Sequence, residues 1–242
     1  MRRLLRAQAV ALGVVAGLGL AGLAASQSFE GMGKPNLAAN WGSSSEKAVR
    51  PAAPNRTDIP WFQTLVDAAP AGSVLKPPPG EYAGPVLVDK PLIIDGDGQV
   101  TVHGGGKGTV FVIDARGATL RGLALRGSGD SHDSDDACLN VRGDHHLIEG
   151  NTIDDCLFGI DLKQANHNTV RGNRIRSKPV ELGVRGDGLR LWYSNHNLIE
   201  KNDVTDSRDM VAWYANHNTY RGNTGKRSRY SIHFMFAKDS VV

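Results

Sequence analysis

The chain has 242 residues, of which 40% are hydrophobic and only 6% aromatic, and this length is enough for one substantial core. It contains 28 Lys and Arg and 25 Asp and Glu. Three of the arginines and none of the acids fall in residues 1–25, so the rest of the chain is formally neutral. A neutral chain lacks the basic stripe on which binding to nucleic acid depends, and we predict no nucleic-acid partner.

Residues 1–25 are predicted to be an export signal. Three arginines precede an apolar run from Ala7 to Ala25, and small residues stand before Ser26. A basic start, an apolar stretch and small residues at the cleavage point are typical of such signals, and they predict a periplasmic or otherwise exported protein. An uncleaved membrane anchor is the alternative, because the run is near the lower length limit for crossing a bilayer.

Residues 26–56 are rich in Ser, Ala, Asn, Pro and Gly and have no apolar periodicity, which predicts a disordered tether. Thr57 and Pro60 then provide the start signals of a short helix at 61–69, one face of which is apolar. Short apolar runs of alternating character follow, separated by Gly, Asn and Asp, and they predict strands. These runs lie at 86–88, 92–94, 100–102, 110–113 and 120–125.

A nine-residue phrase recurs in the second half of the chain. It occurs at 165–173, 194–202 and 215–223, with a degenerate copy at 143–151. The copies end on asparagines that lie 22, 29 and 21 residues apart, and an insertion at 177–183 accounts for the longer interval. A repeat of about 22 residues is too short for helical repeats of the tetratricopeptide or ankyrin kind, which need about 33. The closing asparagines are Asn151, Asn173, Asn202 and Asn223.

We therefore predict an all-β fold for residues 57–242, a right-handed parallel β-helix with the short helix at 61–69 as its N-terminal cap. An ordinary β-sandwich is the alternative, but sandwiches lack such close internal repetition. No capping sequence is visible after residue 236, so we expect an open strand edge at that end.

Stacking the copies by their shared turn predicts which side chains face the core. One inward-facing column comprises Cys138, Ile160, Leu189, Met210 and Ile232. Two outward-facing columns comprise Leu139, Asp161, Arg190, Val211 and His233, and Val141, Lys163, Trp192, Trp213 and Met235. The closing asparagines are expected to hydrogen-bond from coil to coil. Cys138 is expected to be a buried thiol, although pairing with Cys156 is the alternative in an exported protein.

Three consecutive coils carry a pattern that resembles the NosD family, the periplasmic β-helical accessory proteins of nitrous oxide reductase maturation. The pattern comprises Arg185–Trp192, Arg208–Met210 and Arg229–Met235, and the segment Pro79–Val86 also looks like the first coil of that family. The similarity spans roughly residues 65–238. The chain departs from the family at Ser231, where glycine is usual, and it ends where members typically continue for several more coils.

The resemblance implies a non-enzymatic accessory protein that assists copper delivery to a periplasmic copper enzyme. The implied partners are the membrane and ATPase subunits of an ABC transporter, together with a copper chaperone or the copper enzyme itself. The motif residues would then form an interaction surface. They are Arg185, Asp187, Trp192, Arg208, Asp209, Trp213, Arg229 and Tyr230.

His233 and Met235 form a candidate copper site. They are two residues apart on one predicted strand and therefore share a face, and imidazole with thioether is a ligand set that suits Cu(I). Two ligands do not complete a site, so packing of residues 230–235 at the end of the solenoid is the simpler alternative.

Four histidines occupy equivalent positions in the repeated phrase. Neighbouring coils lie about 4.8 Å apart, which is too far for adjacent histidines to share a metal ion at bonds of about 2 Å. We therefore attribute this column to turn chemistry. Its members are His145, His167, His196 and His217.

A carbohydrate-active β-helix is the alternative function, as a polyuronate lyase or epimerase or as a sugar-binding module. The insertion at 130–136 carries four aspartates and one histidine and faintly resembles an alginate-epimerase motif. Acidic clusters can hold Ca²⁺ against a uronate, and Trp192 and Trp213 could stack on sugar rings. A solvated acidic turn and an aromatic cover of the core are the simpler interpretations.

Overall fold

The computed structural model describes residues 47–54 and 58–242, all of which belong to the unit Lys47–Val242. The predicted export signal and most of the predicted tether lie outside these described residues. The described end of the tether is attached to the solenoid, because the Ala48 N–H donates to Asp114 and Arg50 pairs with Asp67. None of the helices within the described ranges has the length and apolar character needed to cross a bilayer.

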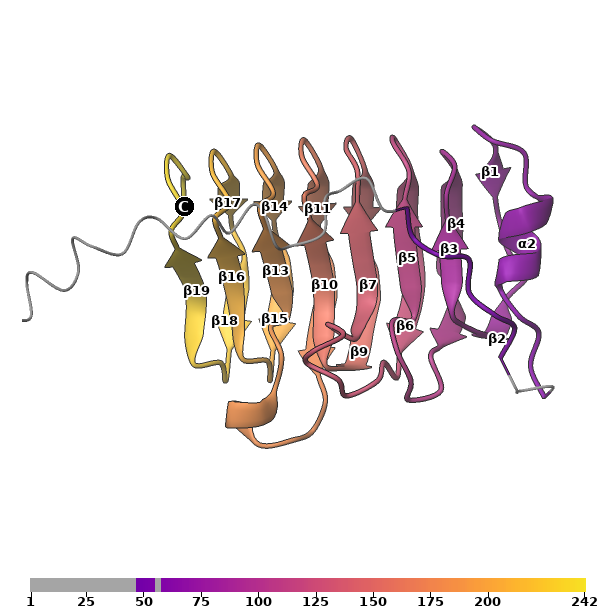
Figure 1. The fold of residues 1–242 in the computed structure, drawn as a ribbon, viewed down its shortest axis with the longest axis horizontal. Coiled ribbons are helices and arrows are strands. Elements are labelled where there is room, and N and C mark those ends of the chain that lie inside the picture. Colours follow the sequence, from indigo (N-terminus) through magenta and orange to yellow (C-terminus); the bar gives the residue numbers. More distant parts are fainter. Residues whose placement is uncertain (1–46, 55–57) are drawn as a thin grey trace, which may run out of the picture. The chain divides into compact units, whose positions relative to one another are not determined.

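The strands wind into a solenoid in which each coil pairs in parallel with the coils on either side, so the predicted all-β parallel β-helix is confirmed (Figure 1). One wall is a seven-stranded sheet in the order β19-β16-β13-β10-β7-β5-β3. Its strands are β3 (Val86–Val88), β5 (Phe111–Asp114), β7 (Ala137–Arg142), β10 (Phe158–Lys163), β13 (Leu189–Trp192), β16 (Asp209–Trp213) and β19 (Tyr230–Met235).

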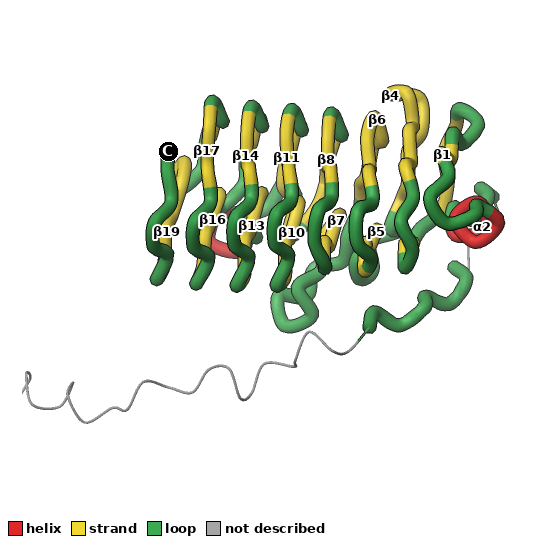
Figure 2. Tube along the Cα trace, turned by 90° about the horizontal axis from the view of Figure 1, so that it is seen from above, coloured by secondary structure: helices red, strands yellow, loops and turns green. Residues whose placement is uncertain are grey.

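The remaining strands form a twelve-stranded sheet, which makes up the other two walls. Its first wall, seen in Figure 2, contains β8 (Leu147–Glu149), β11 (Thr169–Arg171), β14 (Leu198–Glu200) and β17 (Thr219–Arg221). Its second wall contains β9 (Thr152–Cys156), β12 (Arg174–Ser177), β15 (Asp203–Thr205) and β18 (Thr224–Lys226). The long strands β4 (Ile93–His103) and β6 (Thr119–Arg126) join the two walls, and β1 (Val74–Leu75) and β2 (Gly80–Ala83) pair with β4.

The predicted N-terminal cap is present as α2 (Gln63–Ala68), which lies at the end of the solenoid beside β1 and β2 (Figure 1). Phe62 and Val66 are buried in the main core. The side chain of Gln63 accepts from the Leu87 N–H at 2.6 Å and donates to the Leu87 carbonyl at 3.0 Å. The helix therefore satisfies backbone groups of β3 that would otherwise be left unpaired at the first coil.

The predicted columns are confirmed from β10 onward but are wrong by one residue in β7. Ile160 pairs with Leu139 rather than with Cys138, so Leu139 faces the core and Asn140 takes the outward position beside Asp161. Val141, which we expected to face outward, is likewise fully buried. The turn that follows β7 is one residue shorter than the turns of the later coils. An assignment counted back from the shared turn therefore places every side chain of β7 on the wrong face.

The asparagine ladder is confirmed. The backbone N–H of Asn151, Asn173 and Asn202 each donates to the side-chain oxygen of the next asparagine, at 2.9, 3.0 and 3.0 Å. A second ladder, which we did not predict, runs along the neighbouring turn through His146, Asn168, Asn197 and Asn218. Amide side chains thus supply the corner backbone with partners that strand pairing cannot provide.

Cys138 and Cys156 form a disulfide, so the preferred prediction of a buried thiol is wrong. The bond joins β7 to the end of β9 and closes the coil between them. Both side chains are fully buried. The two cysteines are 18 residues apart in sequence, and only the winding of one coil brings them together.

Candidate functional site

The outer face of the seven-stranded sheet brings most of the predicted site residues together. Register places Asp161, Arg190, Val211 and His233 in one outward column on β10, β13, β16 and β19. Lys163, Trp192, Trp213 and Met235 form the outward column two residues further along each strand. The face is therefore charged over β10 and β13 and becomes apolar and aromatic toward β19.

Arg190 is the centre of the charged part. It binds Asp161 through two hydrogen bonds of 2.8 and 2.9 Å and contacts Asp135 at 2.9 Å, although it is 8% exposed and Asp161 is fully buried. Burial opposes the charged form, but the two carboxylates overcome it and raise the pKa of Arg190. Its guanidinium also lies 4.1 Å above the ring of Phe158.

The acidic insertion at 130–136 is fastened to this sheet. Asp135 bonds Lys163 at 2.5 Å as well as Arg190. Burial works against its ionisation, yet the charges of Arg190 and Lys163 hold the pKa of Asp135 below its ordinary value. Asp136 is buried and accepts the Ser131 N–H at 3.0 Å. Asp135 and Asp136 thus anchor the insertion, and their oxygens are directed at protein groups rather than at a metal ion. Asp130 and Asp133 remain exposed, so the turn is solvated only in part.

A second insertion meets the first one. It contains the short 3₁₀ helix η1 (Leu182–Val184), and the carbonyl of Val184 lies 2.9 Å from His132 Nε2. His132 also packs edge-on against Phe158. Leu182 and Val184 of this loop are exposed. In the part of the chain that the structure describes, no three His, Cys, Asp or Glu side chains form a group that could hold a metal ion.

The Arg-Asp motif residues pair from coil to coil. Asp187 is 3% exposed and receives two hydrogen bonds from Arg208, at 3.0 and 3.1 Å. Burial raises the pKa of Asp187 in spite of that arginine. Asp209 is fully buried, accepts the Tyr230 N–H at 2.8 Å and pairs with Arg229. The two aspartates are thus held inside the wall, whereas Arg229 and Tyr230 remain exposed.

His233 lies against this second pair. Its Nδ1 is 3.5 Å from Asp209 Oδ2, and its ring lies 5.0 Å from that of Tyr230. Nδ1 is buried and makes no hydrogen bond within the described residues, and the same is true of Nε1 of Trp213. Met235 pairs in register with Trp213. Met210 faces the core, as predicted, and is 2% exposed, so it cannot join His233 and Met235 as a third ligand.

Residues 109–242 match a protein family described as "Right handed beta helix region". This match agrees with the observed fold. The chain belongs to the right-handed β-helix family. Over 133 residues this β-helix protein is 30% identical to the "Probable ABC transporter binding protein NosD" of Pseudomonas aeruginosa. That alignment covers 54% of the chain and 31% of the relative, so the chain spans about a third of its length.

A solved structure also resembles this β-helix, a pectin methylesterase mutant in complex with a hexasaccharide. The identity is 13%, the TM-score is 0.40, and the match covers 68% of the chain and 76% of the other protein. A likeness at this level carries no information on activity or substrate.

The aromatic residues of the β-helix interlock instead of forming an open platform. Trp192 and Trp213 meet at 65° with ring centres 4.9 Å apart, so their planes do not offer one flat surface to a sugar. Beside them Tyr193, Tyr214 and Phe236 form a parallel stack with spacings of 4.9 and 4.8 Å. We missed this stack, although its members follow the outward column Trp192, Trp213 and Met235 by one residue in each copy.

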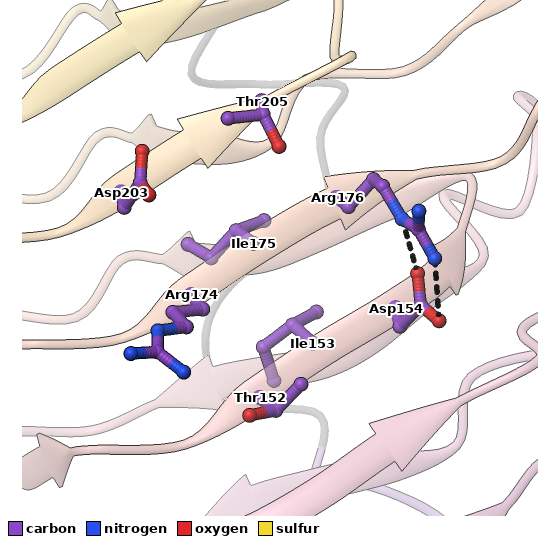
Figure 3. A pocket seen from close by; sticks show the side chains of 8 residues that line it. All are labelled: Thr152, Ile153, Asp154, Arg174, Ile175, Arg176, Asp203 and Thr205. Atoms are coloured by element: carbon purple, nitrogen blue, oxygen red, sulfur yellow. Dashed lines mark hydrogen bonds and ion pairs between the residues drawn. The ribbon is translucent and has the colours of Figure 1, made fainter.

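A hollow of about 240 Å³ lies on the opposite side of the coil, over β9, β12 and β15 (Figure 3). Arg176 closes one end by binding Asp154 through two hydrogen bonds of 2.7 and 3.1 Å. Arg174 points away from that pair. The hollow contains none of the predicted site residues, and the sequence carried no signal for it beyond the outward alternation of its polar side chains.

Proposed function

We propose that this chain is an exported accessory protein of the NosD kind, which assists copper delivery to an exported copper enzyme of the nitrous oxide reductase type and works with an ABC transporter. The observation that carries the proposal is the group of Asp209, His233 and Met235 on the outer face of β16 and β19. The 30% identity to a probable ABC transporter binding protein supports the choice of partner.

The arrangement around His233 suits a soft metal ion as cargo. A carboxylate next to one imidazole nitrogen favours the proton on that nitrogen and leaves the other nitrogen as the lone-pair donor. The carboxylate beside Nδ1 is that of Asp209, whose Oδ2 lies 3.5 Å from this nitrogen without a hydrogen bond to it. The thioether of Met235 lies on the same face of the same strand, and thioether with imidazole favours Cu(I).

Two protein ligands leave the remaining positions of the ion open to another protein. This incompleteness fits transfer better than storage, because a closed ligand set would retain the ion. The exposed side chains beside the pair are Arg229 and Tyr230, and Tyr230 is 52% exposed. We assign the contact with a donor or acceptor protein to this edge of the sheet, and we propose no catalytic step for the chain.

Export is part of the proposal and has independent support. Disulfides form and persist in oxidising compartments such as the periplasm and are rare in the cytosol. The fully buried Cys138–Cys156 bond therefore agrees with the basic and apolar segment at residues 1–25, which predicts an export signal.

A Cu(I) competition titration against a coloured chelator tests the site. His233→Ala is expected to weaken Cu(I) retention about tenfold or more, since even the groups that support metal ligands contribute that much. Met235→Leu should weaken it as well while keeping the volume of the side chain. His217→Asn, at an exposed histidine outside the site, is the matched control and should leave retention unchanged.

Equal Cu(I) retention by the native protein and His233→Ala would contradict the assignment of the copper site.

Incubation with polyuronates tests the enzymatic alternative. Unsaturated or epimerised products would show a lyase or epimerase activity and would contradict the accessory role.

A further inference from the structure

Two side chains approach the same buried carboxylate oxygen at the edge of the seven-stranded sheet. Asp209 is fully buried, and its Oδ2 accepts a hydrogen bond from Nη2 of Arg229. The same oxygen lies 3.5 Å from Nδ1 of His233. Nδ1 is itself buried and has no hydrogen-bond partner within the described residues. The arginine thus holds the carboxylate oxygen that is closest to this nitrogen.

The carboxylate of Asp209 is held in one orientation. Its Oδ1 accepts the Tyr230 N–H at 2.8 Å, so both oxygens are engaged. The centre of the Tyr230 ring lies 5.0 Å from the guanidinium carbon of Arg229 and 5.0 Å from the centre of the His233 ring. Tyr230 therefore contacts both side chains that approach the carboxylate and keeps them beside it.

Arg229 is held less firmly than the arginine of the neighbouring pair. Arg227 binds both oxygens of Asp206 through two hydrogen bonds. Arg229 reaches Asp209 through Nη2 alone among the bonds that the described residues show. Two parallel bonds fix a guanidinium in place, and an ionised carboxylate oxygen has two lone-pair sites. Oδ2 of Asp209 therefore keeps one site for a second donor.

The preceding coil shows the same kind of pair without a histidine. There Arg208 binds Asp187 through two hydrogen bonds. Val211 occupies the position that is in register with His233. An arginine–aspartate pair thus belongs to this wall whether or not an imidazole is present. His233 is therefore additional to what the wall needs.

We propose that Arg229 withholds the carboxylate of Asp209 from His233 and thereby limits the strength with which this histidine binds a metal ion. The inference rests on the proposed copper function and assigns a positioning residue to that site. A carboxylate that accepts the N–H of one ring nitrogen fixes the tautomer and makes the other nitrogen a stronger ligand. With Arg229 on Oδ2 this hydrogen bond does not form, and the imidazole remains a weaker ligand, which suits transfer of the ion.

A purely structural role for Arg229 makes a different prediction. In that role the arginine only compensates the buried charge of Asp209, so its loss would lower stability without any effect on the imidazole. Arg227 provides the matched control, because it pairs with Asp206 in the adjoining turn. Within the described residues no histidine lies at ion-pair distance from that aspartate.

Two measurements on Arg229→Gln test the inference. In the metal-free protein at about pH 8, where an ordinary histidine is neutral, the ¹⁵N resonances of the His233 ring should show a larger share of protonated Nδ1 than in the native protein. In the Cu(I) competition titration, retention should become roughly tenfold tighter, the lower end of what a carboxylate behind a ligating histidine contributes. Arg229→Lys, which keeps the cation, should resemble the native protein, and Arg227→Gln should change neither measurement.

The gain should require the carboxylate, so Arg229→Gln/Asp209→Asn is expected to abolish it. Unchanged Nδ1 protonation in Arg229→Gln, or the same gain without the carboxylate, would overturn the inference. The ¹⁵N measurement needs no copper: failure of the native protein to retain Cu(I) would contradict the proposed function, whereas the ¹⁵N result alone decides whether Arg229 withholds Asp209. Far-UV circular dichroism checks that each variant is folded, and Arg229→Met, which keeps the apolar stem, replaces Arg229→Gln if that variant does not fold.

Discussion

At each corner of the solenoid, one side chain hydrogen-bonds backbone groups of the neighbouring coil. The type of residue at that position differs between coils. Along one ladder the position holds Asn168, Asn197 and Asn218, but in the coil of β8 it holds His146. Nδ1 of His146 accepts the Ala118 N–H at 3.0 Å, and its Nε2 lies 3.0 Å from the Arg142 carbonyl. A neutral imidazole thus replaces the amide, but unlike an amide it can be protonated.

His146 is expected to make the stability of the protein sensitive to mild acid. Burial lowers the pKa of this histidine below its ordinary value of about 6.5. The unfolded chain therefore takes up the proton first as the pH falls, so the free energy of unfolding should decrease below about pH 6.5, by at most about 1.4 kcal/mol per pH unit. His146→Asn should remove this dependence, as measured by urea denaturation between about pH 5 and 8.

The exposed neighbour provides the control. His145→Asn should leave the pH dependence as it is in the native protein. A slope that survives in His146→Asn would show that other groups are responsible.

At the scale of elements, contacts between coils hold both the strands and the insertions in place. Asp135 holds the insertion at 130–136 in place through ion pairs with Lys163 of β10 and Arg190 of β13. The corner between β11 and β12 is fixed by Asn173, whose Nδ2 donates to the Ile148 carbonyl and whose Oδ1 accepts the Asn151 N–H. Asn173 thus satisfies backbone groups of the adjacent coil, whereas Asp135 acts on charged side chains.

Asn173→Ala is expected to lower the free energy of unfolding by about 2–4 kcal/mol, because it leaves the Asn151 N–H and the Ile148 carbonyl buried without partners. Urea denaturation measures the change. Arg174→Ala is the matched control next in the chain, since this exposed side chain makes no ion pair among the described residues, and it should shift stability by no more than about 0.5 kcal/mol. Equal effects of the two substitutions would contradict the structural role of the ladder.

At the scale of the whole solenoid, one core extends from Phe62 in the cap to Tyr220 in β17. Stability in such a chain depends on contacts between neighbouring coils, so a bond that closes one coil also supports the coils on either side. The Cys138–Cys156 disulfide is in that position, in the coil directly after the acidic insertion.

Reduction of this disulfide is expected to lower the free energy of unfolding by about 3 kcal/mol, the value for a closed loop of this length. Cys138→Ala/Cys156→Ala should show a comparable loss and should not respond to a reductant, which separates the effect of the bond from other effects of the reagent. Two free thiols in the native protein under oxidising conditions would show that the bond does not form.

The sequence alone was sufficient for the repeat, the parallel β-helix, the cap, the asparagine ladder and the outward columns from Asp161 onward. These depend on side-chain alternation and turn chemistry, which are local properties of the chain. Only the tertiary structure revealed the shorter turn after β7, the disulfide between Cys138 and Cys156, and the ion pair between Asp135 and Arg190. Each of these is set by how one coil winds onto the next, which brings together residues far apart in sequence. The same winding stacks the exposed rings of His145, His167, His196 and His217 in parallel and places Asp209 beside His233.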